Sequence, residues 1–259
     1  MAVPARIRMT FGSLITLLSL IVVGSARAAA PLRKQAYQRS PLLCSRALWQ
    51  HGRMISITRG DPGSNEIALT FDDGPHPPYT LKLLALLKRL DVPATFFVVG
   101  WKVDQAPWVL PFILRNGDEI GNHTYHHFDL KLAPPALTAT EISLCNDAVW
   151  RACGIRPRFF RPSGGQYDPA VLREAASQRM ITTLWTDDPA DYVKPGAKVI
   201  ESRLLSHIHP GAIILLHDGI EQTYSILPDF VARMKRDGYH FVTMSELAQH
   251  VEMLHHVGR

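Results

Sequence analysis

Two adjacent carboxylates and a pair of histidines are the residues of this sequence best suited to chemistry. Asp72 and Asp73 stand side by side before a Gly-Pro turn, and His123 and His127 are four positions apart. Two neighbouring carboxylates repel each other unless a cation neutralises one of them. Histidines four apart face the same way on a helical turn, so they could share a metal ion. We therefore predict a metal site built from Asp73, His123 and His127, with coordination positions left for water and substrate.

The type of reaction follows from the second carboxylate. A set of two histidines and one carboxylate serves hydrolytic zinc ions and also the ferrous ions of oxygenases. Asp72 beside such a metal favours hydrolysis, because it can act as general base toward a water molecule. The zinc-protease pattern H-E-x-x-H is absent, since Thr124 stands where its glutamate would be. The expected cofactor is Zn²⁺, with Co²⁺ or another divalent ion and iron-dependent oxygenation left open.

The residues around these side chains predict the elements that position them. Apolar runs indicate strands at 67–71, 94–99, 119–123, 159–160, 181–185, 213–216 and 240–242, and helices at 81–90, 107–115, 138–152, 169–178, 197–206 and 222–235. Thr138 and Glu141 match a capping box at the start of one of these helices. The alternation continues without a domain-breaking linker, and no dinucleotide or phosphate-loop motif favours an open doubly wound sheet. We therefore predict a single-domain α/β fold, a deformed (β/α) barrel of about seven strands.

Three further polar clusters follow later predicted strands. Arg161 comes directly after 159–160, Asp191 lies in a run of carboxylates after 181–185, and His217 ends the apolar run 213–216. A structural ion pair and a packed core histidine are the simple explanations for Arg161 and His217. Functional residues of (β/α) barrels gather where strands end, however, and all three clusters fall there. We expect them to lie beside the metal site.

The order of these motifs carries a family resemblance. The chain contains, in sequence, T-F-D-D-G-P, A-T-F-F-V-x-G, N-H-T-Y-H-H, F-R-P-x-x-G, D-x-x-D-Y and L-L-H-D. Together they resemble the polysaccharide deacetylase family, which is the NodB-homology domain or carbohydrate esterase family 4, over residues 67–247. The resemblance implies a deformed (β/α) barrel and a metal-dependent removal of N- or O-acetyl groups from sugar polymers.

The resemblance also implies a catalytic role for four positions. Asp72 matches the catalytic base, and Arg161 matches the residue that orients this base through a charge-assisted bond. His217 matches the catalytic acid, and Asp191 matches the carboxylate that holds it. The pairing is chemically reasonable, because amide hydrolysis needs a base for water and an acid for the departing amine.

Five more positions are implied to hold the metal and the substrate. Asp73, His123 and His127 match the three metal ligands of the family. Leu215 resembles the residue that lines the pocket for the acetyl methyl group, and the backbone N–H of Gly164 matches the donor to the oxyanion.

Two departures from the family pattern affect the substrate groove. The third motif usually reads R-P-P-aromatic-G, but Ser163 and Gly164 stand at the second proline and the aromatic residue. Tyr192 replaces the usual tryptophan of the fourth motif. The missing ring at position 164 removes one wall of the groove, so the polymer that the protein prefers stays open.

The charge of the chain is concentrated at its N-terminus. The 259 residues carry a formal net charge of +5, from 28 Lys and Arg against 23 Asp and Glu. Residues 1–28 hold three arginines and no acidic residue, and an apolar run of signal-peptide length ends in an A-x-A exit. We predict an exported protein, periplasmic or secreted, with a membrane contact only through an uncleaved leader. The small charge left after 28 gives no reason to expect a nucleic-acid partner.

The predicted organisation is a signal peptide at 1–28, an irregular N-terminal extension at 29–60, the deacetylase-like domain at 61–250 and a C-terminal tail at 251–259. Cys145 and Cys153 lie too far apart on a predicted helix to bridge each other. Cys44 could pair with either one or stay unpaired. The oligomeric state is open.

The predicted function is the removal of acetyl groups, N-acetyl above all, from a polysaccharide or oligosaccharide containing N-acetylglucosamine, such as peptidoglycan or chitin. A small-molecule amidase or deformylase on the same barrel is one alternative. A glycan-binding wall protein that has lost catalysis is another, although the complete set Asp72, Asp73, His123, His127 and His217 argues against it.

Overall fold

The computed structural model describes residues 47–257 of the chain. The predicted leader at 1–28 and Cys44 lie outside these residues, so both predictions concern a part of the chain that is not described. Within 47–257, no helix combines the length and the apolar character needed to cross a lipid bilayer.

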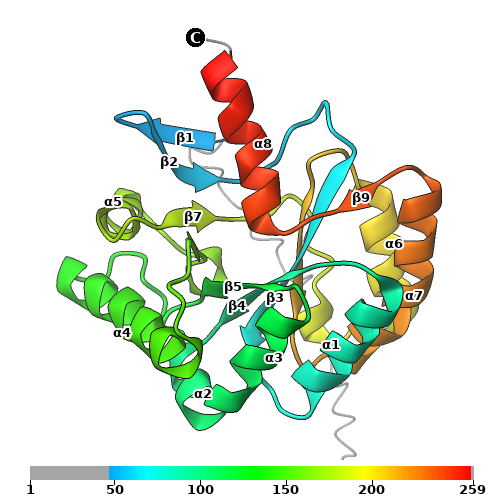
Figure 1. The fold of residues 1–259 in the computed structure, drawn as a ribbon, viewed down its shortest axis with the longest axis horizontal. Helices are drawn as coiled ribbons and strands as arrows, with labels where there is room; N and C mark the ends of the chain where they lie inside the picture. The colour runs from blue at the N-terminus through cyan, green and yellow to red at the C-terminus, as the bar shows by residue number, and fades with distance from the viewer. Residues whose placement is uncertain (1–46, 258–259) are drawn as a thin grey trace, which may run out of the picture. The chain divides into compact units, whose positions relative to one another are not determined.

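One curled sheet organises the described residues. Its strands are β1 (Ala47–Gln50), β2 (Arg53–Ile57), β3 (Glu66–Gly74), β4 (Thr95–Val98), β5 (Glu119–Asn122), β6 (Phe159–Phe160), β7 (Ile181–Thr183), β8 (Ile213–His217) and β9 (His240–Phe241). The hydrogen-bonded order is β1-β2-β7-β6-β5-β4-β3-β8, with β9 pairing with β3. Every pair is parallel except β1 with β2. Because β1 and β8 end this order, the sheet curls like a barrel without closing (Figure 1).

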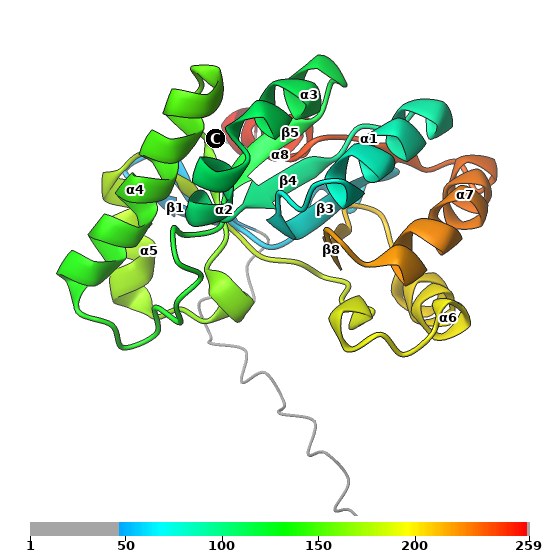
Figure 2. The same cartoon turned by 90° about the horizontal axis from the view of Figure 1, so that it is seen from below.

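Helices follow most of the strands and lie around the outside of the curled sheet, as the two perpendicular views show (Figures 1 and 2). They are α1 (Tyr79–Leu90), α2 (Gly100–Gln105), α3 (Leu110–Arg115), α4 (Pro135–Cys153), α5 (Pro169–Ser177), α6 (Ala197–His207), α7 (Glu221–Arg236) and α8 (Met244–Val257), with 3-10 turns at Pro107–Val109, Ser163–Gly165 and Asp191–Val193. This alternation confirms the predicted deformed (β/α) barrel. The short helix α2 is an addition that the apolar pattern did not reveal.

Side-chain alternation along β3 separates an apolar outer face from a functional inner face. Leu69 and Phe71 are fully buried in the core between the sheet and the outer helices. Ala68 belongs instead to the core inside the curl. Successive side chains of a strand point to opposite faces, so Thr70 and Asp72 continue the inner row. The strand therefore carries an aspartate into the barrel at its carboxyl end.

Helix α8 packs against the end of the barrel where the strands begin. Its Met244, Leu247 and Val251 join the inner apolar core with Phe97. The backbone N–H of Met244 donates to Thr95 Oγ1, at the first residue of β4. Apolar packing thus fills this end of the barrel, and polar side chains occupy the other. The helix runs to Val257, so residues 251–257 of the predicted tail are helical.

The prediction of an irregular segment before residue 60 is wrong for residues 47–57. These residues form the β1–β2 hairpin, and β2 joins the sheet beside β7. His51 and Gly52 both have positive φ, 48° and 76°, which is the two-residue hairpin turn whose twist suits antiparallel strands. The strands have four and five residues, too short for an alternation of apolar and polar residues to stand out in the sequence.

The predicted capping box at Thr138 and Glu141 is also wrong. Helix α4 begins at Pro135, which is tolerated at a first helical position because it lacks the N–H that a helix start leaves unpaired. Thr138 and Glu141 are therefore inside the helix and buried. Cys145 and Cys153 lie on the same intact helix as free thiols.

Candidate active site

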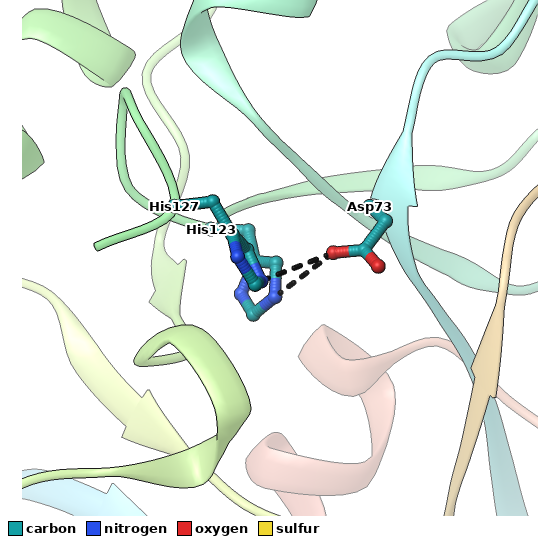
Figure 3. A group of neighbouring side chains, drawn as sticks. All are labelled: Asp73, His123 and His127. Atoms are coloured by element: carbon teal, nitrogen blue, oxygen red, sulfur yellow. Dashed lines mark ion pairs between the residues drawn. The ribbon is translucent and has the colours of Figure 1, made fainter. Parts of the chain in front are cut away.

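Asp73, His123 and His127 converge at the carboxyl ends of β3 and β5 (Figure 3). Asp73 Oδ1 lies 3.5 Å from His123 Nε2 and 3.2 Å from His127 Nε2. The three ligand atoms lie within 4.8 Å of one another. The side chain of His123 is 2% exposed, whereas those of Asp73 and His127 are 34% and 41% exposed. The group therefore opens to solvent on one side, where water and substrate could reach a bound cation.

A β-bulge brings Asp73 to this group. Asp72 pairs with Phe97 and Gly74 pairs with Val98, so Asp73 is an extra residue in β3 relative to β4. Its φ of 71° is in the left-handed region, which a non-glycine residue adopts only when its surroundings hold it there. In a regular strand Asp72 and Asp73 would point to opposite faces, and the bulge re-aims the second carboxylate.

The two histidines meet through a loop and not through the helical turn that their spacing suggested. Thr124 and His127 have φ values of 67° and 64°, and no helix is assigned between positions 123 and 127. The backbone N–H of Thr124 donates to Asn122 Oδ1, at 2.8 Å, and the Thr124 hydroxyl accepts from the His127 N–H, at 3.0 Å. The three predicted ligand side chains thus come together, although the geometry that unites them is different from the predicted helical turn.

Glu141 holds this loop by hydrogen bonds. The sequence analysis had assigned it to a capping box instead. Its Oε2 accepts the backbone N–H groups of Tyr125 and His126, at 3.1 and 2.7 Å. Its Oε1 lies 2.7 Å from His126 Nδ1. The carboxylate is 1% exposed, so these donors compensate for its burial. The side chain of His126 is thus paired with Glu141.

The protonation states of the ligands suit a cation. His123 Nδ1 lies 2.8 Å from the carbonyl oxygen of Arg161, which fixes the proton on Nδ1 and leaves Nε2 as the free acceptor. Burial lowers the pKa of His123 despite the nearby carboxylates of Asp72 and Asp73. Burial alone would raise the pKa of Asp73, but the hydrogen bond with His127 and the histidine charges hold it well below its ordinary value. Neutral imidazole and ionised carboxylate are the forms that bind a divalent metal, so these residues fit one.

Arg161 and Asp72 form a fully enclosed ion pair behind the metal group. Arg161 Nη1 donates to Asp72 Oδ1 at 2.7 Å and to Thr70 Oγ1 at 2.8 Å. The guanidinium is 0% exposed and lies over the ring of Phe97, with 4.0 Å from Cζ to the ring centre. The other Asp72 oxygen, Oδ2, lies 3.6 Å from His123 Nε2. Arg161 thus holds one oxygen and directs the other to the metal group.

His217 and Asp191 form a second hydrogen-bonded pair. His217 Nδ1 lies 2.6 Å from Asp191 Oδ1, while the His217 backbone N–H and the Thr223 hydroxyl donate to Asp191 Oδ2 at 2.9 and 2.7 Å. Burial alone would lower the pKa of His217, but the hydrogen bond and charge of Asp191 outweigh it, and the pKa is raised. His217 is directly paired in register with Asp72 on the neighbouring strand. The structure thus brings this pair to the strand ends that carry Asp72.

The residues implied to hold the substrate lie around the same strand ends. Leu215 is 4% exposed and stands two residues before His217 on β8, hence on the same face. Gly164 lies in the exposed turn after Arg161, with φ of 57°. The ring of Tyr192 approaches that of His217 edge-on, with centres 5.2 Å apart.

A cleft of about 380 Å³ extends from Asp73 and His217 into a region that the sequence analysis missed. Lys102 is its most informative lining residue, because its Nζ donates to the backbone oxygen of Asp73 at 2.8 Å and lies 2.7 Å from His76 Nε2. Lys102 comes from α2, a helix absent from the prediction. Lys102 is recognised as part of the site only from its contact with Asp73 in the folded protein.

Comparisons with known proteins agree with this arrangement. The sequence profile of a family described as polysaccharide deacetylase matches residues 59–182. A peptidoglycan-N-acetylglucosamine deacetylase of Bacillus cereus is 37% identical over 194 residues, which cover 71% of this chain and 88% of that protein. A chitooligosaccharide deacetylase of Bradyrhizobium is 34% identical over 200 residues, which cover 71% of this chain and 91% of that protein.

Solved structures of similar chains include an enzyme and a pseudoenzyme. A peptidoglycan N-acetylglucosamine deacetylase matches with a TM-score of 0.71 at 31% identity, over 73% of this chain and 91% of that one. A CE4 family pseudoenzyme of Bacillus anthracis matches with the same TM-score at 30% identity, over 74% of this chain and 68% of that one. The shared fold alone therefore does not establish activity.

Proposed function

Because the chain belongs to the polysaccharide deacetylase family, we propose that it removes acetyl groups, N-acetyl above all, from a glycan containing N-acetylglucosamine, such as peptidoglycan or a chitooligosaccharide. The relatives named for these two substrates support the glycan class. The observation that carries the proposal is the meeting of three units at adjacent strand ends: the metal group of Asp73, His123 and His127, the Asp72–Arg161 pair, and the His217–Asp191 pair.

We propose Zn²⁺ as the bound metal, since two imidazole nitrogens and one carboxylate oxygen form a donor set of hydrolytic zinc sites. Co²⁺ or another divalent ion fits the same donors. When bound, the cation supplies Lewis-acid chemistry, lowering the pKa of water and polarising the acetyl carbonyl.

Asp72 is proposed as the base that takes a proton from the attacking water. Its Oδ2 faces the metal group, while Oδ1 is held by Arg161. The charge-assisted bond fixes the orientation of the carboxylate. Arg161 acts through Asp72 and is therefore a positioning residue.

His217 is proposed as the acid that protonates the departing amine nitrogen. Its Nδ1 is engaged by Asp191, which leaves Nε2 as the nitrogen that can reach the substrate. The raised pKa of His217 keeps this proton available near neutral pH. Asp191 is then the residue that sets the orientation and the charge of the acid.

Leu215 and Gly164 are proposed to contact the acetyl group itself. The buried aliphatic side chain of Leu215 offers an apolar surface to the methyl group. The backbone N–H of Gly164 is proposed as a donor to the oxyanion, in a turn whose left-handed φ favours glycine.

Action on a cell-wall glycan agrees with the export leader proposed at 1–28. The proposed order after this leader is the N-terminal extension, the catalytic domain and the C-terminal tail. The protein is proposed to act in the periplasm or outside the cell, with membrane attachment only through an uncleaved leader. No nucleic-acid partner is proposed.

The test is acetate release by the metal-analysed protein from chitooligosaccharides, peptidoglycan and acetylated xylan, with and without a chelator. Release from a substrate with N-acetylglucosamine, lost on chelation, supports the proposal. The Asp72→Asn variant, assayed in parallel, controls for contaminating esterases. If the metal-loaded protein binds these glycans but releases no acetate, the alternative of a silent glycan-binding protein replaces the proposed enzyme.

A further inference from the structure

The cleft beside the metal group extends beyond the residues that the proposed reaction uses. Its lining is formed by Asp73, His76, Tyr79, Lys102, Tyr192, Lys194, His217, Asp218, Gly219 and Ile220. Two of these residues are lysines, contributed by α2 and by the end of the Asp191–Val193 turn. Their charges bear on the substrate that the cleft accepts.

Two carboxylates share this lining with the two lysines. Asp73 is a member of the metal group, where its charge serves the cation. Asp218 is 2% exposed, and its two oxygens accept hydrogen bonds from the hydroxyls of Thr80 and Tyr224. Asp218 is thus enclosed, whereas Lys194 in the same lining is exposed to solvent.

Lys102 is held in place as a fixed cation. Its Nζ donates to the Asp73 backbone oxygen at 2.8 Å and lies 2.7 Å from His76 Nε2. An ammonium group has three N–H donors, so these two contacts leave one. Little conformational entropy remains to be lost when Lys102 binds an anion.

Lys194 is the second lysine of the cleft lining. Its residue is exposed, and among the described residues its side chain makes no hydrogen bond or ion pair. Tyr192, two positions earlier, and Tyr79 add two aromatic side chains to the same lining. Aromatic rings next to cations suit a ligand that has both a sugar ring and a negative charge.

From this arrangement we infer that the cleft holds a subsite for a sugar residue bearing a carboxylate, next to the sugar that loses its acetyl group. Lys102 and Lys194 would bind the carboxylate, and Tyr79 and Tyr192 would contact the ring. The inference rests on the proposed function and narrows its substrate to an acidic glycan, in which neutral acetylated sugars alternate with acidic ones. Neutral chitin lacks the group that these lysines recognise.

The test compares two ligands that differ only in charge. A tetrasaccharide of alternating N-acetylglucosamine and N-acetylmuramic acid is titrated calorimetrically into the zinc-loaded Asp72→Asn protein, and so is its neutral methyl ester. The Asp72→Asn background prevents deacetylation during the titration. The acid is expected to bind about fivefold tighter than the ester at low salt, and the ratio to fall toward one as salt screens the lysines.

Two variants and one control locate the effect. Lys194→Gln and Lys102→Gln are each expected to remove most of the preference for the acid. Lys198→Gln changes an exposed lysine four residues from Lys194 that does not line the cleft, and is expected to keep it. Lys102 also contacts Asp73, so Lys102→Gln could alter the metal group. In that case the result with Lys194→Gln decides the test.

Equal affinity for acid and ester, or a preference that survives both variants, overturns the inference. Acetate release from a neutral chitooligosaccharide, measured on the protein without Asp72→Asn, reports on the proposed function separately. A charge preference without any acetate release contradicts the deacetylase and retains the subsite. Acetate release without a charge preference supports the deacetylase and contradicts the subsite.

Discussion

Asp72 and Asp73 are neighbours in one strand, yet Asp72 Oδ2 and Asp73 Oδ1 lie 3.6 and 3.5 Å from the same atom, His123 Nε2. The bulge at Asp73 makes this possible, because it turns the second carboxylate to the side that the first already faces. The remaining partners differ: Arg161 holds Asp72, whereas His127 lies against Asp73. One carboxylate is thus positioned to act on water and the other to bind a cation.

Replacing each aspartate by asparagine is expected to separate these two tasks. Asp72→Asn should bind the metal like the native protein and lower kcat/KM by about 10²–10⁴-fold, the usual effect of removing a general base. Asp73→Asn should lose metal affinity, because a neutral amide replaces the charged ligand. Metal affinity is measured by chelator competition and activity by acetate release. Equal loss of metal in both variants contradicts this division.

Removal of the metal is expected to abolish activity and to lower stability. The bound cation relieves the repulsion between the carboxylates of Asp72 and Asp73, and it binds only the folded chain. A metal at 100 times its Kd stabilises the folded state by about 2.7 kcal/mol. Thermal unfolding with and without chelator measures this difference, and re-addition of Zn²⁺ should restore acetate release. The His217→Ala variant should keep the stabilisation while losing activity, since His217 is not a metal ligand.

The pH dependence of the reaction is expected to follow His217. Because Asp191 raises the pKa of His217, the acid stays protonated to higher pH, and kcat/KM falls as the pH rises through that pKa. Asp191→Asn removes the carboxylate charge and should move this basic limb to lower pH. Thr223→Val removes only one hydrogen bond to Asp191 and should shift it much less. An unmoved limb in Asp191→Asn would show that another group carries the proton.

Glu141 is expected to affect metal binding without touching the metal. Glu141→Gln keeps the shape but puts an amide nitrogen or a neutral oxygen where N–H groups of Tyr125 and His126 need acceptors. Buried N–H groups then lose their acceptor, which should destabilise the fold by about 1–3 kcal/mol. The loop that carries His127 is no longer held in place, so metal affinity should fall as well. Asp147→Asn is the matched control, since Asp147 is an exposed carboxylate on the same helix. Unfolding in denaturant and chelator competition measure the two effects.

Local sequence patterns predicted most of the fold, whereas the roles of the site residues were implied by the family resemblance of the motifs. Apolar runs marked β3 to β9 because most of these strands are buried on both faces, and the motif residues follow the ends of the strands. The geometry that unites them could not be predicted in this way. The bulge at Asp73 and the loop from His123 to His127 depend on partners distant in sequence, such as Arg161 and Glu141.

The same limit explains the elements that were missed. The hairpin Ala47–Ile57 is too short for its alternation to be recognised, and its second strand is stabilised by pairing with β7. Helix α2 has six residues, fewer than an isolated helix needs, and packs against α4. Lys102 therefore gained its significance only from the contact of α2 with the strand end at Asp73.

Two glycines in the turn after Arg161 allow a direct test of packing against the site. Gly164 and Gly165 have φ values of 57° and 67°, so an alanine at either costs about 1–2 kcal/mol in backbone energy. A Cβ at Gly165 would lie 2.5 Å from the Trp185 ring, whereas one at Gly164 would meet only Gln166 Cγ at 3.9 Å. Gly165→Ala should therefore lower the free energy of unfolding by about 1–3 kcal/mol more than Gly164→Ala, because of overpacking. Denaturant unfolding of both variants measures the difference, and equal losses would mean that Trp185 moves aside without cost.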